Sequence, residues 1–376
     1  MFIFKKRPII LVVGSAHVDV FGDFDTSQAN AIDKEGEIVC SIGGTAFNIA
    51  VDLASEATVQ VILYTHLKKN SLSTDLIIRR LRREFISTRY VIRDDSIKSD
   101  SGFIAHRSNM ELTSAVSSMP IQQATINIGK IESIAKRSSV IIAECNLSSA
   151  QLNNIAKICT KLNKPFLVGG VSESKCKRVR LLDAAASPLI AYFSINITEA
   201  AALIGKPLGK LIEIDASTAK LICELSRAST VIITGGSDGW INASIDGSIK
   251  ANAAPVSPVV VSTSGAGDAL IAGLGYHLAH DRSPSDISKA TETIHRFIDR
   301  VLRHRASSGS EFTNVDSMNS EYRHYLKLLS RNKSSFIGAA LAGIGLIAGI
   351  IQAAVSLETS TTVADFIRRI FSPDRW

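Results

Sequence analysis

Short apolar runs, rich in β-branched residues, alternate along the chain with stretches whose apolar positions have helical spacing. The runs predict buried β-strands, and the periodic stretches predict amphipathic helices. Strands that alternate with helices of this length favour an α/β fold with a doubly wound sheet. The predicted strands cover residues 8–14, 37–44, 58–65, 139–145, 165–171, 190–196 and 229–236. The predicted helices cover residues 45–56, 74–85, 148–163, 198–205 and 216–228.

A more polar, serine-rich region interrupts this alternation over residues 94–125. Within it, the stretch 101–118 predicts two short antiparallel strands of a small β lid. We expect further lid elements within residues 15–45. Together these elements make one domain over residues 1–305, and the polar stretch 306–335 that follows predicts a linker with a short helix.

Residues 336–357 form an uncharged, apolar segment that is long enough to cross a hydrocarbon core of about 30 Å. Gly345 and Gly349 have the spacing that suits close helix packing in lipid. The segment therefore predicts a transmembrane helix, and a buried, glycine-rich core helix is the alternative. Basic residues before it (Lys327, Arg331, Lys333) favour a cytoplasmic main domain, although others follow it in the tail 358–376 (Arg368, Arg369, Arg375). We expect a single-pass membrane protein.

The composition excludes some classes of protein. A hydrophobic content of 45% and a charged content of 20% are typical of a globular chain and exclude a disordered one. The basic clusters at 79–83 and 296–305 alternate with apolar residues, as on solvated helix faces; contact with a membrane surface or a polyanion is the alternative. No nucleic-acid motif accompanies the net charge of +7, so we expect no nucleic-acid partner. The five scattered cysteines predict reduced thiols.

The stretch 262–278 combines small residues, one aspartate and an apolar helical pattern. At a helix start, the backbone N–H groups of Gly265, Ala266 and Gly267 can turn inward together and hold an anion. Asp268 would lie beside that anion, where a carboxylate can take a proton from an alcohol that attacks a phosphoryl group. The alternative is an aspartate that only complements the helix dipole. The stretch alone leaves both interpretations open.

This stretch resembles the D-T-x-G-A-G-D signature of the PfkB-type, ribokinase-like carbohydrate kinases. Ser262 stands in place of the first aspartate, and Thr263, Gly265, Ala266, Gly267 and Asp268 match the other positions. The resemblance implies a ribokinase-like sheet with a small β lid. It also implies that Asp268 is the catalytic base, that residues 265–267 form the anion hole, and that Thr263 binds the nucleotide.

Two motifs nearer the start of the chain resemble marks of the same family. Gly43, Gly44 and Asn48 match G-G-x-x-x-N-x-A, which implies that they bind the substrate, and a tight turn into a helix is the alternative. Asp19 matches the last position of G-x-x-N-x-D, where it would hold sugar hydroxyls. His17 stands where asparagine is usual in that motif. Otherwise an aspartate at a strand end is most often a turn residue.

Two motifs in the second half of the predicted sheet complete the resemblance. Asn196 and Glu199 match N-x-x-E, which implies that Asn196 lies with the nucleotide and that Glu199 organises Mg²⁺ through water. The alternative is an ordinary helix start. Thr234, Gly236 and Gly239 match the strand that ends in T-x-G, and they would lie along the nucleotide phosphates.

A finer resemblance is to the pseudouridine-kinase-like branch, which tends to show G-G-V-A-x-N-I-A, D-x-N-L and D-P-V-S. This chain reads GGTAFNIA, ECNL with Glu144 in place of aspartate, and GGVS with Gly169 at an acidic position. Where many members have an acidic G-D-D turn, it reads HLKKNSLSTD over residues 66–75.

The resemblance implies an ATP-dependent kinase that phosphorylates a hydroxyl on a sugar or nucleoside, with a pseudouridine-like nucleoside among the candidates. It implies ATP and Mg²⁺ as cofactors, a monovalent cation such as K⁺ as a further candidate, and a homodimer as a possible assembly. The alternative hypothesis is a membrane-tethered kinase fold that is catalytically weak or inactive and has a binding or regulatory role. The departures at Ser262, Gly169 and residues 66–75 motivate that alternative.

Overall fold

The computed structural model describes residues 7–28, 33–108, 111–183, 189–280 and 290–303. The chain divides into two compact units, Met1–Phe312 and Thr313–Trp376, and all the described residues belong to the first. Over these ranges, no helix has both the length and the apolar character needed to span a membrane. The predicted linker 306–335, transmembrane segment 336–357 and tail 358–376 lie outside the described residues.

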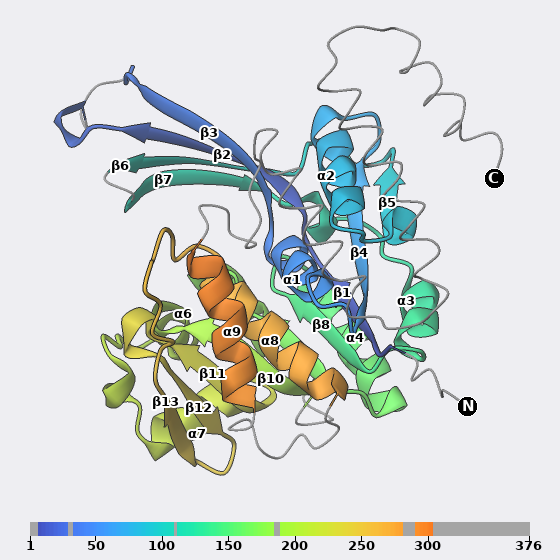
Figure 1. The fold of residues 1–376 in the computed structure, drawn as a ribbon. Helices are drawn as coiled ribbons and strands as arrows, with labels where there is room; N and C mark the ends of the chain where they lie inside the picture. The colour runs from blue at the N-terminus through green and yellow to red at the C-terminus, as the bar shows by residue number, and fades with distance from the viewer. Residues whose placement is uncertain (1–6, 29–32, 109–110, 184–188, 281–289, 304–376) are drawn as a thin grey trace, which may run out of the picture. The chain divides into compact units, whose positions relative to one another are not determined.

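A nine-stranded sheet runs through the described unit (Figure 1). The seven strands β5, β4, β1, β8, β9, β10 and β11, which are neighbours in this order, are parallel. The strands β12 and β13 extend the sheet beyond β11, and each is antiparallel to the strand before it. The doubly wound ribokinase-like prediction therefore holds for most of the sheet but missed this edge. In spatial order the strands are β13 (Ile249–Asn252), β12 (Trp240–Ser244), β11 (Ala228–Thr234), β10 (Ile190–Asn196), β9 (Phe166–Gly169), β8 (Val140–Glu144), β1 (Ile9–Val13), β4 (Gln60–Lys68) and β5 (Val91–Asp94).

Helices cover both faces of this sheet, so its central strands are apolar on both sides. In β1, Leu11 and Val13 join one hydrophobic cluster, whereas Ile10 and Val12 join the other. The first cluster includes residues of α3 (Ile128–Ala135), α4 (Ser149–Leu162), α5 (Glu173–Cys176), α6 (Ile197–Ile204) and α7 (Ala216–Ser226). The second includes residues of α1 (Thr45–Ala54), α2 (Leu72–Arg83), α8 (Ala266–His280) and α9 (Thr291–Leu302).

A second sheet of four strands forms the lid (Figure 1). Its order is β3 (Gly36–Gly43), β2 (His17–Phe24), β6 (Gly102–Ser108) and β7 (Glu111–Ser118). The strands β6 and β7 are antiparallel, as the stretch 101–118 predicts. Asp19 pairs with Phe103 across β2 and β6, so these side chains and that of Phe21 lie on one face of the lid. The other face exposes Ile38, Ile104 and Val116.

The strand predicted over 58–65 continues further than its apolar run. In the structure β4 extends to Lys68, because residues Thr65 to Lys68 pair in parallel with β5. His66 is therefore a strand residue and not part of a turn. Its neighbour in the register is Ile92.

Candidate functional site

The functional motifs gather where the parallel strands end. In open α/β sheets, ligands bind at the carboxyl ends of the strands. Ser15 follows β1, Glu144 ends β8, Gly169 ends β9, and Thr234 ends β11. The helix α8 brings Asp268 to the same region, since the side chain of Asp268 contacts that of Asn48 in α1.

The helix α8 begins at Ala266, so Asp268 lies in its first turn, as the sequence predicts. Gly265 has a φ of 83°, a left-handed conformation that side chains other than glycine rarely adopt, and its carbonyl accepts from Ala269 N–H at 2.8 Å. The N–H group of Ala266 donates to the Thr263 carbonyl at 3.2 Å. In this state, one of the three predicted anion-hole N–H groups is therefore engaged within the loop.

Asn48 holds the carboxylate of Asp268 directly. The Asn48 side-chain amide donates to Asp268 Oδ2 at 2.8 Å, although the two residues are 220 positions apart. Gly44 has a φ of 109°, and a Cβ there would come within 2.7 Å of the Ser15 carbonyl oxygen. Only glycine lets the chain enter α1 at this point and present Asn48. The sequence assigned Asn48 to the substrate, and this contact with the predicted base was missed.

The surroundings tune the carboxyl group of Asp268. Burial raises the pKa of Asp268 to about 7, and the hydrogen bond from Asn48 opposes that rise. The carboxylates of Glu144, Glu199 and Asp19 raise the pKa of Asp268 further. A base with a pKa near the working pH suits proton removal from an alcohol, because it is both available and strong enough.

Asp19 lies on the lid face near this site. It is buried, and its Oδ1 is 2.9 Å from Nε2 of His17 two residues earlier on the same face of β2. A Cβ at Gly43 would overlap Oδ2 of Asp19, so any larger residue there would displace the Asp19 carboxylate. The paired glycines and Asp19 thus fit together as one unit, which agrees with the predicted grouping of Gly43, Gly44 and Asp19.

An aromatic surface beside Asp19 was not predicted from the sequence. Phe103 meets Phe21 edge to face, with ring centroids 6.1 Å apart, and its ring centroid lies 6.4 Å from that of His17. The Arg107 guanidinium stacks 4.1 Å from the Phe21 ring centroid and makes two hydrogen bonds of 2.6 Å to Asp23. Every second position in 17–23 and 103–107 contributes to this surface, and that alternation was the available signal.

A buried polar cluster also escaped prediction. The carboxylate of Glu144 accepts from the Ser15 N–H at 2.7 Å and from the Asn146 N–H at 2.6 Å. Asn146 donates to the Ser15 hydroxyl at 2.9 Å and accepts from Lys175 Nζ at 2.6 Å. Burial raises the pKa of Glu144, and these N–H donors oppose the rise. The motif ECNL was the signal, since Glu144 and Asn146 both belong to it.

Asn196 and Glu199 form a capping box at the start of α6. Asn196 Oδ1 accepts from the Glu199 N–H at 2.8 Å, and Glu199 Oε2 accepts from the Asn196 N–H at 3.1 Å. This is the helix start that the sequence left as the alternative. Burial raises the pKa of Glu199 to about 7, and the neighbouring Glu173 adds to the rise.

The acidic residues of the site suit a magnesium ion that is bound mainly by nucleotide phosphates and water. Across the described ranges, no group of three or more histidine, cysteine, aspartate or glutamate side chains could hold a metal by itself. Mg²⁺ that arrives with nucleotide phosphates keeps several waters and needs only one or two carboxylates. Glu199 is buried and its charge acts on Asp268, so Glu199 is the carboxylate that would meet that requirement.

Among the predicted nucleotide residues, Asn196 ends β10 and Thr234 ends β11, and Gly236, Gly239 and Thr263 lie between β11 and α8. Gly236 and Gly239 have φ values of 64° and 82°, and the turn between them closes through a 2.8 Å hydrogen bond from Gly235 N–H to the Gly239 carbonyl. The Thr234 hydroxyl is 3.5 Å from the Ile195 carbonyl oxygen, and Thr263 is exposed. No side chain of this group is tied to Asp268 by a contact that the structure describes.

Two departures from the family motifs have local compensations. The Ser262 hydroxyl accepts from the Ser264 N–H at 3.2 Å, which is a short turn that an aspartate would also make. A Cβ at Gly169 would lie 3.0 Å from Cδ1 of Ile271 in α8. A side chain at residue 169 would therefore push against the Ile271 side chain.

The sequence matches the family model described as pfkB family carbohydrate kinase over residues 8–292. The chain belongs to this family. It is therefore a kinase, and membership in the pfkB family supports ATP-dependent phosphorylation of a sugar-like substrate.

Individual relatives agree with this assignment. The pfkB-family chain is 26% identical to the pseudouridine kinase of Escherichia coli K12 over 276 residues, which are 72% of this chain and 83% of that protein. Ribokinase from Giardia lamblia has the same fold, with a TM-score of 0.68, 16% identity, and coverage of 84% of this chain and 100% of that one. Arabidopsis thaliana ribokinase, solved with ribose and ATP, gives a TM-score of 0.67 at 16% identity, covering 81% and 95%.

Proposed function

We propose that this kinase transfers the γ-phosphoryl group of ATP to a hydroxyl group of a nucleoside or sugar, with Asp268 as the general base. The observation that carries the proposal is the Asp268 carboxyl at the start of α8, held by Asn48 and with a pKa raised by burial to about 7. A carboxylate with that pKa can accept the proton as the alcohol attacks.

In the proposed reaction, Asp268 takes the proton of the acceptor hydroxyl while the acceptor oxygen forms a bond to the γ-phosphorus. The bond from the γ-phosphorus to the bridging oxygen of ADP breaks, and ADP leaves with that electron pair. Asp19 orients the acceptor, and the N–H groups of 265–267 stabilise charge on the transferring phosphoryl group. Mg²⁺ bound with ATP would neutralise phosphate charge, and Glu199 would hold it through water.

A nucleoside, with a pseudouridine-like compound as the leading candidate, is the substrate class that we favour. Two observations support this choice. Phe21 and Phe103 give the lid an aromatic surface beside Asp19, against which a planar base can pack. The relative with 26% identity is a pseudouridine kinase. A free sugar has no planar base to pack against Phe103.

The purified full-length kinase tests the proposal with ATP, Mg²⁺ and a panel of acceptors that includes ribose, adenosine, uridine and pseudouridine. We expect turnover with a nucleoside, and we expect Asp268→Asn to reduce kcat by on the order of 10²- to 10⁴-fold. The exposed Asp246→Asn serves as the matched control and should retain full activity. Turnover should also decline below pH 7, because protonation removes the base.

If no acceptor gives turnover above the Asp268→Asn background, the enzyme proposal fails. The alternative, a catalytically weak or inactive kinase fold with a binding role, would then account for the site. Turnover with ribose alone would support the kinase proposal and overturn the proposed preference for a nucleoside.

We also propose that residues 336–357 attach the kinase to a membrane, with the pfkB domain on the cytoplasmic side. The support is the uncharged length of the segment and the basic residues that precede it.

A further inference from the structure

The segment 66–75, which departs from the family pattern, begins with a histidine that the proposed reaction does not use. Tyr64 and His66 are two residues apart in β4, so their side chains lie on the same face of the strand. Both are buried, and their ring centroids are 5.5 Å apart. A buried histidine needs hydrogen-bond partners for both ring nitrogens.

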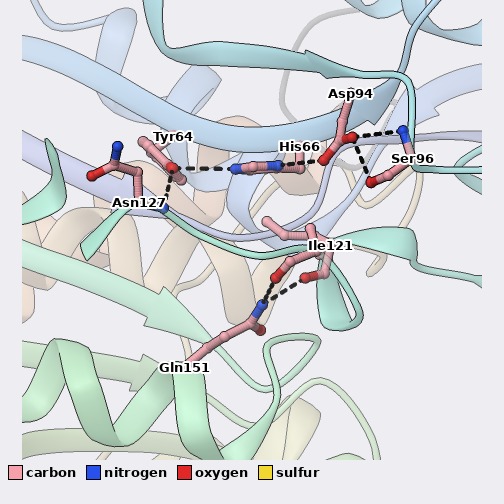
Figure 2. A network of polar contacts seen from close by, with 8 residues as sticks. Tyr64, His66, Asp94, Ser96, Ile121, Asn127 and Gln151 are labelled. Carbon is pink, nitrogen blue, oxygen red and sulfur yellow. Dashed lines mark hydrogen bonds and ion pairs between the residues drawn. The ribbon is translucent and has the colours of Figure 1, made fainter. Parts of the chain in front are cut away.

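His66 connects two polar groups from different parts of the chain (Figure 2). Its Nε2 is 3.1 Å from the Tyr64 hydroxyl, and its Nδ1 is 3.4 Å from Oδ2 of Asp94. The Tyr64 hydroxyl oxygen in turn accepts from the Asn127 N–H at 3.1 Å. Asp94 also accepts from the N–H and hydroxyl of Ser96, at 2.8 Å and 2.6 Å.

The direction of these bonds follows from the charge of the ring. Burial lowers the pKa of His66, which favours the neutral imidazole. The Asp94 carboxylate can only accept, so Nδ1 carries the proton and Nε2 accepts from the Tyr64 hydroxyl. Each group therefore donates to the next: the Asn127 N–H to the Tyr64 hydroxyl oxygen, the Tyr64 hydroxyl to Nε2 of His66, and Nδ1 of His66 to Asp94.

The two ends of this chain lie next to the two connections of one lid hairpin: Asp94 is the last residue of β5, and Asn127 precedes α3. Residues 95–101 lead from Asp94 into β6, and residues 119–127 lead from β7 to Asn127, which caps α3. Gln151 of α4 fastens the second connection again, because its amide donates to the carbonyls of Ile121 and Ala124 at 2.9 Å and 2.8 Å.

The two connections help to place the hairpin, because it has few anchors in the main sheet. Of the side chains described in β6 and β7, none belongs to either hydrophobic cluster of the main sheet. The hairpin is therefore positioned by the pairing of β6 with β2, by side-chain contacts between these two strands such as Arg107 with Asp23, and by the segments on either side of it. The position of β6 in turn places Phe103 next to Asp19.

We propose that Tyr64 and His66 are positioning residues that clamp both connections of the β6–β7 hairpin and thereby hold Phe103 over the acceptor beside Asp19. The proposal rests on the proposed function for the acceptor itself, but the clamp is a property of the chain alone. It gives the departure at residue 66 a role in substrate binding.

Tyr64→Phe tests the clamp, because it removes one buried hydroxyl and keeps the shape of the ring. His66→Gln is the second variant, since a single amide cannot reach both Tyr64 and Asp94. Tyr276→Phe is the control; it removes the 2.8 Å hydrogen bond between Tyr276 of α8 and Thr58, away from the lid connections. Each full-length protein is compared with the parent by hydrogen exchange and by steady-state kinetics.

We expect amides in 119–127 to exchange about five- to tenfold faster in Tyr64→Phe, as the loss of one buried hydrogen bond allows. In His66→Gln, amides in 95–101 should accelerate as well. With an active acceptor, KM for the acceptor should rise severalfold while kcat and KM for ATP stay near the parent values. Tyr276→Phe should leave all of these unchanged.

Unchanged exchange in both connections of both variants would overturn the clamp. Faster exchange spread over the whole protein would also overturn it, because the two residues would then only support the core. If the parent itself turns over no acceptor, the proposed function fails, and hydrogen exchange alone still decides whether the clamp exists.

Discussion

At the residue scale, Asp52 is a buried carboxyl group next to the site, and its burial destabilises the fold. It lies one helical turn after Asn48 in α1 and is only 2% exposed. Within the described part of the chain, neither of its carboxylate oxygens has a hydrogen-bond partner. Burial raises the pKa of Asp52 well above its usual value, the charge of Asp268 adds to this, and Arg300 opposes it. The folded protein therefore keeps the Asp52 proton to a higher pH than the unfolded chain does.

Asp52→Asn should stabilise the kinase, and the gain should grow as the pH rises. The unfolded chain loses the Asp52 proton near pH 4, whereas the folded chain keeps it to a higher pH. As the pH rises between these two pKa values, the free energy of unfolding falls by about 1.4 kcal/mol per pH unit. Asparagine has a similar shape and no such proton. Urea unfolding at pH 4.5 and pH 8 should show a larger increase for the variant at pH 8.

An equal effect of Asp52→Asn at both pH values would show that Asp52 is ionised in the folded state. The exposed Asp246→Asn provides the comparison, since it changes the same charge without burial.

At the element scale, β4 links the main sheet to the lid through His66. The groups that act on this ring are Asp94 on β5, which raises the pKa of His66, Lys130 on α3, which lowers it, and Tyr64 on the same strand. Burial is the largest influence, and the net result is a pKa of His66 below its usual value. Protonation would give both ring nitrogens a hydrogen and would leave the Tyr64 hydroxyl proton without its acceptor.

The stability of the kinase should therefore decline as the pH falls below about 6.5, where the unfolded chain begins to bind a proton that the folded His66 resists. The loss continues until the pH reaches the lowered pKa of the folded state. His66→Gln should flatten this decline, whereas the exposed His106→Gln should not. Urea unfolding at pH 7.5 and pH 5.5 measures the difference, and parallel declines in parent and His66→Gln would contradict it.

Much of the fold could be read from the sequence, because apolar runs such as that of β1 and periodic stretches such as that of α4 carry strong local signals. The short edge strands β12 and β13 lack such a signal and were missed. The predicted groupings at Asp268 and at Gly43 and Gly44 came from motifs. The contact of Asn48 with Asp268 and the link from His66 to Asp94 join segments that only the folded chain brings together.

At the scale of the whole molecule, the division after Phe312 makes the kinase domain a unit of its own. Removal of residues 313–376 should leave its thermal midpoint within a few degrees of the parent and its turnover unchanged. The full-length protein should sediment with membranes, whereas the shortened protein should stay in the supernatant. Equal partitioning of both proteins would contradict membrane attachment through 336–357.

Inside the domain, the β6–β7 hairpin is a further part that contributes little to the core. None of its described side chains belongs to either hydrophobic cluster. A segment that adds little to the core can change its sequence without endangering folding. New acceptor specificities can therefore arise in this hairpin by drift or by transplantation from a related kinase. The proposed catalytic groups on α1 and α8, two helices that are part of the core, would stay constant as the hairpin diversifies.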